Sequence, residues 1–116
     1  MTNLATKKLN EKMPSTPKEI NKLAWAHNAG FFFGDIDKKV RKSKKRSFEC
    51  YLISADMGDA EGQFWTGVNY MAGRGVKADV NKAYKYLTLA AKQGHLDAPI
   101  RIKAIEDYFK MEYLTA

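Results

Sequence analysis

One pattern in this chain recurs at a spacing of 36 residues. Eight positions of similar size and role align: Val40, Ser43, Ser47, Phe48, Ile53, Ser54, Ala55 and Gly58 correspond to Val76, Asp79, Ala83, Tyr84, Leu89, Ala90, Ala91 and Gly94. A fixed period of this length is typical of stacked helix–turn–helix units, which bury their apolar faces against one another. The repeat therefore predicts an all-α fold, a short α/α solenoid of about five antiparallel helices.

Helix start and stop residues place the expected helices along the chain. Ser15 and Thr16 can cap a helix that has Pro17 in its first turn, and Gly34 is expected to end it after Phe33. Further helices are expected over residues 44–57, 60–72, 79–93 and 97–113. Residues 1–14 are predicted to be a mobile N-terminal arm, and residues 15–116 a single helical-repeat domain.

The second copy of the pattern carries a specific set of residues. These are Gly67, Tyr70, Gly73, Gly75, Val76, Asp79, Lys82, Ala83, Ala90, Ala91, Gly94 and Ala98. At this spacing the run from Gly62 to Ala98 resembles a Sel1-like repeat, although Gly62 and Thr66 replace the usual Ala and Leu. The resemblance implies a solenoid related to tetratricopeptide arrays and a scaffold or adaptor role, with no catalytic residues.

A degenerate repeat precedes this one, with about three extra residues between Gly34 and Val40. In it Phe31 takes the place of Tyr70, and Trp25 falls opposite Phe64. A half-repeat from Ala98 to Tyr113 is expected to close the array, with Tyr108, Phe109 and Tyr113 packed as its cap.

The net charge of +7 comes from one short segment. Its basic residues are Lys38, Lys39, Arg41, Lys42, Lys44, Lys45 and Arg46, and no acid lies among them. Three of them fall in the first turn of a helix, where the helix dipole disfavours positive charge. The segment is either a solvated basic loop or a contact for an anionic partner, which could be an acidic protein patch or nucleic acid phosphate. No aromatic residues are interleaved with the cations, which argues against base stacking.

Trp65 occupies a variable position of the repeat. It is either exposed as an anchor for a partner or packed on a neighbouring helix. Asn69 follows one helical turn later, and Arg74 and Lys77 lie in the next loop. Together these four residues are expected to form one polar-rimmed patch with an aromatic centre.

The residues that usually carry chemistry are sparse. His27, His95 and Cys50 show no zinc spacing and no paired nucleophile or carboxylate. We therefore expect no catalytic, cofactor or metal site. No signal peptide or membrane-spanning run is visible, so a cytoplasmic chain that does not engage membranes is expected.

These observations favour a non-enzymatic protein–protein interaction module, acting as a small adaptor or as an inhibitor or immunity-type protein. Its partner would be another protein, with an acidic patch facing residues 38–46. The alternative is a nucleic-acid-binding accessory protein that uses the same basic segment. Either a monomer or a homodimer fits the sequence.

Overall fold

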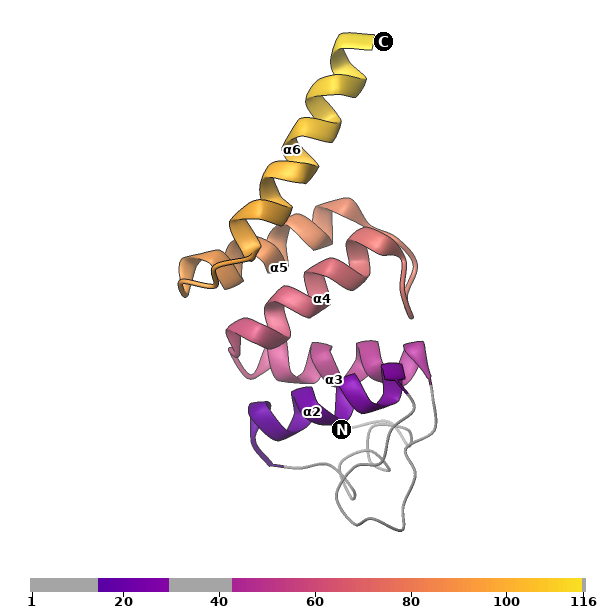
Figure 1. Ribbon diagram of the computed structural model, residues 1–116, viewed down its shortest axis with the longest axis vertical. Coiled ribbons are helices and arrows are strands. Elements are labelled where there is room, and N and C mark those ends of the chain that lie inside the picture. The colour runs from indigo at the N-terminus through magenta and orange to yellow at the C-terminus, as the bar shows by residue number, and fades with distance from the viewer. Residues whose placement is uncertain (1–14, 30–42, 116) are drawn as a thin grey trace.

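The described part of the chain, residues 15–29 and 43–115 of a computed structural model, consists of α-helices without any strand (Figure 1). The helices are α2 (Pro17–Ala29), α3 (Lys44–Asp56), α4 (Ala60–Ala72), α5 (Val80–Lys92) and α6 (Ala98–Thr115). The all-α prediction is confirmed, and four of the five helices begin and end within about two residues of their expected bounds. The predicted N-terminal arm and the stretch from residue 30 to residue 42 lie outside the described residues.

Side-chain caps fix where three of the helices begin. The Ser43 hydroxyl accepts a hydrogen bond from the backbone N–H of Arg46 at 3.1 Å, at the start of α3. Asp59 caps α4 through Gly62 N–H at 2.9 Å, and Asp79 caps α5 through Lys82 N–H at 3.1 Å. Each cap satisfies a backbone donor that has no partner inside its own helix. These starts follow from local sequence, which explains why they could be predicted.

Helices that are consecutive in the chain pack against one another, so the stack runs from α2 to α6. Figure 1 shows α2 paired with α3 and α4 paired with α5, while α6 rises away from the other helices. One buried cluster joins α2 to α3 and contains Ile20, Ala24, Cys50 and Tyr51. A larger cluster contains Phe48, Phe64, Val68, Tyr70, Ala83, Leu87, Ala90, Ala98 and Ile105. Burial of these apolar side chains is what holds the stack together.

Gly67 allows the close approach of α4 and α5. A Cβ atom at this position would lie 2.7 Å from Cγ of Leu87 and 3.1 Å from the carbonyl oxygen of Ala83. Both residues are fully buried, so neither has space into which it could move. The expected structural role of this repeat glycine is therefore supported by the packing.

The expected packing of the C-terminal aromatic residues is wrong for the two that the structure describes. Tyr108 is 64% exposed and Phe109 is 45% exposed, and their rings contact each other edge to face. The buried side of α6 is formed by Ala98 and Ile105 near its beginning, where it packs on α5. The helix then runs beyond α5, so none of the described helices covers its later residues (Figure 1). The side chain of Tyr113 lies outside the described residues.

We expect Gly67→Ala to destabilise the protein. The substitution raises helix propensity by about 1 kcal/mol, but overpacking a buried contact costs typically about 1–3 kcal/mol. The net result should be a lower urea midpoint at an unchanged slope, measured by circular dichroism. Lys85→Ala, at an exposed position of α5, is the control and should change stability little. A higher midpoint for Gly67→Ala would show that the two helices leave room for a methyl group.

Candidate functional site

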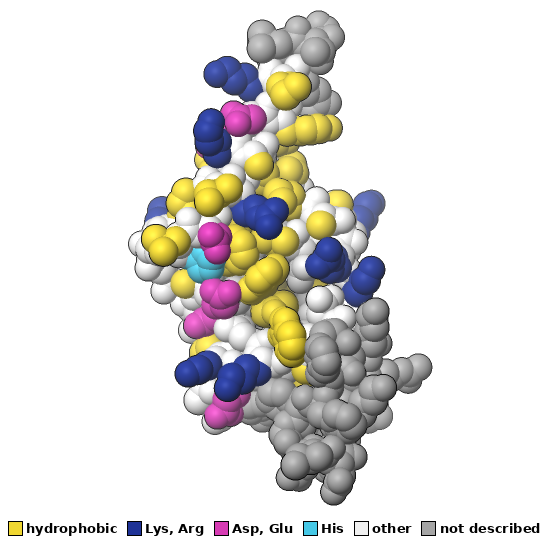
Figure 2. Space-filling model, viewed as in Figure 1, with side chains coloured by type: hydrophobic (Ala, Val, Ile, Leu, Met, Phe, Trp, Pro, Cys, Tyr) yellow, Lys and Arg dark blue, Asp and Glu magenta, His cyan; other side chains and the backbone are white. Residues whose placement is uncertain are grey.

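An apolar groove lies between α2 and α4. It has a volume of about 320 Å³ and is lined by Asn21, Lys22, Trp25, Tyr51, Glu61 and Trp65. Trp25 comes from α2 and is 55% exposed, whereas Tyr51 comes from α3 and is buried at the base. Figure 2 shows hydrophobic side chains gathered on this side of the molecule, continuing upward to α6. An exposed tryptophan beside a shaped apolar groove is typical of protein-binding surfaces.

Trp65 is held in this groove by contacts on several sides. Its ring stacks on Tyr51 with the centroids 5.9 Å apart and meets Phe64 edge to face at 5.1 Å. Its indole N–H donates a hydrogen bond to Oε1 of Glu61 at 2.8 Å. Of the two alternatives for Trp65, packing on a neighbouring helix is therefore observed. The side chain nevertheless stays partly exposed and forms one wall of the groove.

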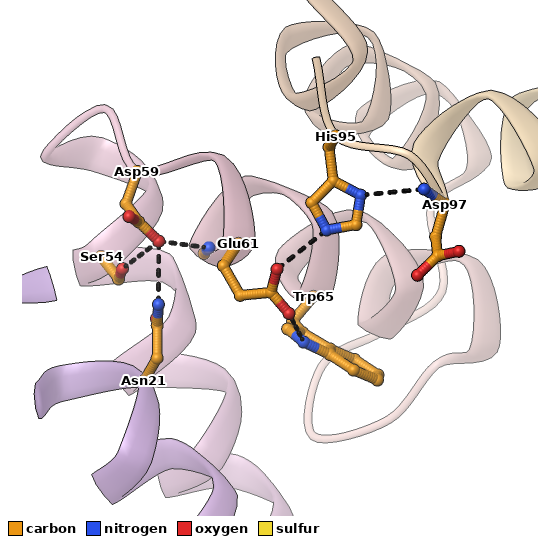
Figure 3. A network of polar contacts seen from close by, with 8 residues as sticks. Asn21, Ser54, Asp59, Glu61, Trp65, His95 and Asp97 are labelled. Carbon is orange, nitrogen blue, oxygen red and sulfur yellow. Dashed lines mark hydrogen bonds and ion pairs between the residues drawn. The ribbon is translucent and has the colours of Figure 1, made fainter. Parts of the chain in front are cut away.

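Glu61 is positioned by two hydrogen bonds, one on each carboxylate oxygen (Figure 3). Oε1 accepts from Trp65, and Oε2 lies 2.9 Å from Nε2 of His95, which comes from the turn before α6. Nδ1 of His95 accepts the backbone N–H of Asp97 at 3.2 Å. With Nδ1 acting as the acceptor of this bond, Nε2 is the nitrogen that donates to Glu61. The carboxylate is thus fixed in orientation at the rim of the groove, where it is 52% exposed.

A second carboxylate joins the helices below the groove. Oδ2 of Asp59 accepts hydrogen bonds from Nδ2 of Asn21 at 2.8 Å and from the hydroxyl of Ser54 at 3.3 Å. The same oxygen caps α4 through Gly62 N–H (Figure 3). One side chain therefore ties α2 to α3 and to the start of α4. This connection fixes how the lining residues of α2 and α4 face each other.

Trp25 is a surface residue that the sequence did not reveal. Its repeat counterpart Phe64 is 4% exposed because the ring of His95 stacks on it, with centroids 4.3 Å apart. In the first repeat, the position equivalent to His95 is occupied by Asp59. The Asp59 carboxylate accepts a hydrogen bond from Asn21 and has no ring that could stack on Trp25. A small polar residue in place of a ring leaves the first tryptophan less covered. This difference between the two repeats is visible in the sequence and could have indicated an exposed Trp25.

The basic residues lie at the opposite end of α4 from Glu61. Lys44, Lys45 and Arg46 are exposed on the first turn of α3, and among the described residues none of them forms an ion pair. Lys38, Lys39, Arg41 and Lys42 lie outside the described residues. The turn that carries Arg74 and Lys77 packs on this same turn of α3, because a Cβ at Gly75 would overlap the carbonyl oxygen of Lys44. We call the five described cations, Lys44, Lys45, Arg46, Arg74 and Lys77, the basic edge.

The expected patch around Trp65 is not formed as predicted. Asn69 is only 4% exposed, because α3 and α5 pack on α4 from both sides and leave little of its surface open. Arg74 and Lys77 lie at the basic edge with the start of α3, away from the aromatic groove. Of the four residues, Trp65 alone lines the groove, where its neighbours are Trp25 and Tyr51.

The groups in and near the groove favour binding over acid–base chemistry. Burial, and then the nearby Glu61 charge, raises the pKa of Tyr51 to about 12, so its phenol stays protonated. Burial raises the pKa of the Cys50 thiol to about 12, which makes it a poor nucleophile. In the described ranges no three His, Cys, Asp or Glu side chains come together as a metal site. No helix in that part of the chain is long and apolar enough to cross a membrane.

The two tryptophans should respond differently to truncation. Trp65→Ala removes the contacts with Tyr51 and Phe64 and the bond to Glu61, so we expect a loss of about 2–4 kcal/mol in stability. Trp25→Ala removes a side chain that is more than half exposed, and a loss below about 1 kcal/mol is expected. Urea unfolding of both variants measures the difference. Equal losses would mean that Trp25 belongs to the core as much as Trp65 does.

The chain is similar to known proteins in both sequence and fold. A sequence model described as the Sel1 repeat matches residues 21–59 and 60–95. The first match is three residues longer than the second, which agrees with the extra residues expected between Gly34 and Val40. The crystal structure of a Sel1 repeat protein from Oxalobacter formigenes is similar, with a TM-score of 0.67 and 30% sequence identity. The similarity covers 76% of this chain and 61% of that one, so this chain spans less than two thirds of that protein. No curated protein matches significantly.

Sel1 repeats generally mediate protein–protein interactions and are typically non-catalytic. Here the two matched repeats correspond to the helix pairs α2–α3 and α4–α5, which build the aromatic groove between them. The matches cover more than half of the sequence, and the chain belongs to the Sel1 repeat family.

Proposed function

We propose that this protein is a small non-enzymatic adaptor or inhibitor that binds a partner protein on the face carrying the groove between α2 and α4. The observation that carries the proposal is Trp25, an aromatic side chain that is 55% exposed beside the partly exposed Trp65. Aromatic anchors of this kind contribute much of the binding energy in protein interfaces. Acting as an inhibitor would require only that the bound surface covers a functional surface of the partner.

A second apolar groove lies near the other end of α4. It has a volume of about 380 Å³ and lies between α6 and the ends of α4 and α5. Its lining residues are Met71, Val80, Ala104, Ile105 and Tyr108. The two grooves flank α4, and in Figure 2 hydrophobic side chains connect this region with α6. A partner that spans both grooves would bury Tyr108, which is 64% exposed.

The basic edge offers the same partner a second contact. Three of its cations stand in the first turn of α3, where positive charge opposes the helix dipole and does not help folding. An acidic patch on the partner would be attracted to this edge, which would raise the association rate and help to orient the complex. The proposed partner is therefore a protein with an aromatic-binding surface and an acidic patch.

Affinity capture with the tagged full chain tests the groove. Wild type should retain one dominant partner from a lysate of the source cells, and Trp25→Ala should weaken its affinity by more than about 1 kcal/mol. Tyr84→Ala is the matched control, because Tyr84 is 42% exposed on α5 and lines neither groove. Isothermal titration with the identified partner gives the affinities. Equal affinities for all three proteins would overturn the proposed surface.

Replacing Lys44, Lys45 and Arg46 with Gln tests the basic edge. Removing cations from the first turn of α3 should leave the melting temperature unchanged or slightly higher. Partner binding should weaken and depend less on salt, compared with a control that neutralises the exposed Lys18, Lys92 and Lys110. Unfolding of the triple variant would mean that the segment is structural. Loss of the captured partner after nuclease treatment, with a steep salt dependence, would favour nucleic acid binding instead.

A further inference from the structure

The groove between α2 and α4 combines aromatic walls with a fixed negative charge. Three of its lining residues are aromatic: Trp25, Tyr51 and Trp65. Aromatic faces attract a cation through their quadrupole, and tryptophan does so most strongly. Glu61 adds a full negative charge at the rim of the same groove. Purely apolar ligands would gain nothing from that carboxylate, so the composition of the groove suits a cationic group.

We propose that this groove is an aromatic cage that binds the guanidinium group of an arginine side chain presented by the partner protein. The inference rests on the proposed function, because it specifies what the partner inserts between α2 and α4. A planar guanidinium can stack on an indole face while it donates hydrogen bonds to a carboxylate. The groove volume of about 320 Å³ leaves room for such a side chain.

Glu61 is prepared to receive such a donor. Each of its oxygens already accepts one hydrogen bond, from Trp65 at 2.8 Å and from His95 at 2.9 Å. A carboxylate oxygen has two lone-pair sites, so one further acceptor site remains on each oxygen. The group is 52% exposed, which leaves it accessible from the groove. The two existing bonds hold the carboxylate in place, so little side-chain entropy would be lost when an arginine binds.

The polar contacts of Glu61 leave its carboxylate open toward solvent. It accepts from the uncharged indole of Trp65 and lies against Nε2 of His95, and its side chain is 52% exposed. Among the described residues, Lys22 also lines the groove with a charged side chain, and it is exposed. The charge of Glu61 also acts at the base of the groove. Burial is the main cause of the raised pKa of Tyr51, and the Glu61 charge is the second cause.

Lys22 provides an internal test of the sign of the effect. As a like charge beside the proposed ligand it should weaken cation binding, so Lys22→Gln should bind a guanidinium more tightly than wild type. Glu61→Gln should act in the opposite direction. Glutamine keeps an acceptor oxygen for the indole of Trp65, while its amide nitrogen replaces the oxygen that lies against Nε2 of His95. The two variants therefore test the sign of the charge effect from opposite directions within one groove.

The experiment uses the folded full chain labelled with nitrogen-15, and follows the indole N–H signals of its two tryptophans by NMR. The probes are methylguanidinium and methylurea, a charged and a neutral molecule of nearly the same shape, titrated at constant ionic strength. We expect methylguanidinium to shift both indole signals to saturation and methylurea to bind roughly tenfold more weakly or not at all. Glu61→Gln should lose roughly tenfold in methylguanidinium affinity, and Trp25→Ala should lose comparably.

Three results would overturn the cage. They are equal binding of the two probes, an unchanged methylguanidinium affinity in Glu61→Gln, and indole signals that neither probe moves. Thermal melts of each variant check that it is folded. If Glu61→Gln also displaces Trp65, Trp25→Ala still tests the aromatic wall of the groove without changing Glu61. Failure here differs from failure of the proposed function: capture that still depends on Trp25, without any preference for the charged probe, would mean that the partner inserts a neutral side chain.

Discussion

Helix α4 is covered by α3 and by α5, and the other features of the molecule follow from this arrangement. Residues on several sides of α4 are buried at once, including Phe64, Gly67 and Tyr70. Gly67 brings α5 into close contact, and Tyr70 packs edge to face on Phe48 of α3 at 5.1 Å. A helix buried on two sides cannot rotate without losing one of its interfaces. The sides of α4 that remain open are therefore fixed, and these sides flank the two apolar grooves.

The aromatic groove is built from parts that also maintain the fold. Trp65 closes the contact between α3 and α4 and forms a wall of the groove. Glu61 is oriented by His95, a residue from the turn after α5 whose ring also covers Phe64. Asp59 joins α2, α3 and α4 beneath the groove. Trp25 is 55% exposed, so its removal should reduce stability less than removal of Trp65.

Charge is distributed unevenly over the described surface. The groove carries the oriented carboxylate of Glu61, while the basic edge gathers five cations at the other end of α4. The edge forms because the turn around Gly75 packs on the first turn of α3, which brings Arg74 and Lys77 next to Lys44. Under our proposals the partner carries an arginine for the groove and acidic residues for the edge. Two contacts of opposite sign would allow one orientation of the complex and oppose the reversed one.

The sequence by itself determined the helices and their order. Ser43, Asp59 and Asp79 cap their helices through residues three positions away, and Gly73 and Gly75 adopt positive φ in the turn, so these features depend on local sequence. Exposure depends on which helix covers a residue, which the repeat pattern does not encode. Asn69 is buried because α4 lies inside the stack, between α3 and α5. Tyr108 and Phe109 are exposed because α6 runs beyond α5, and only tertiary packing decided these outcomes.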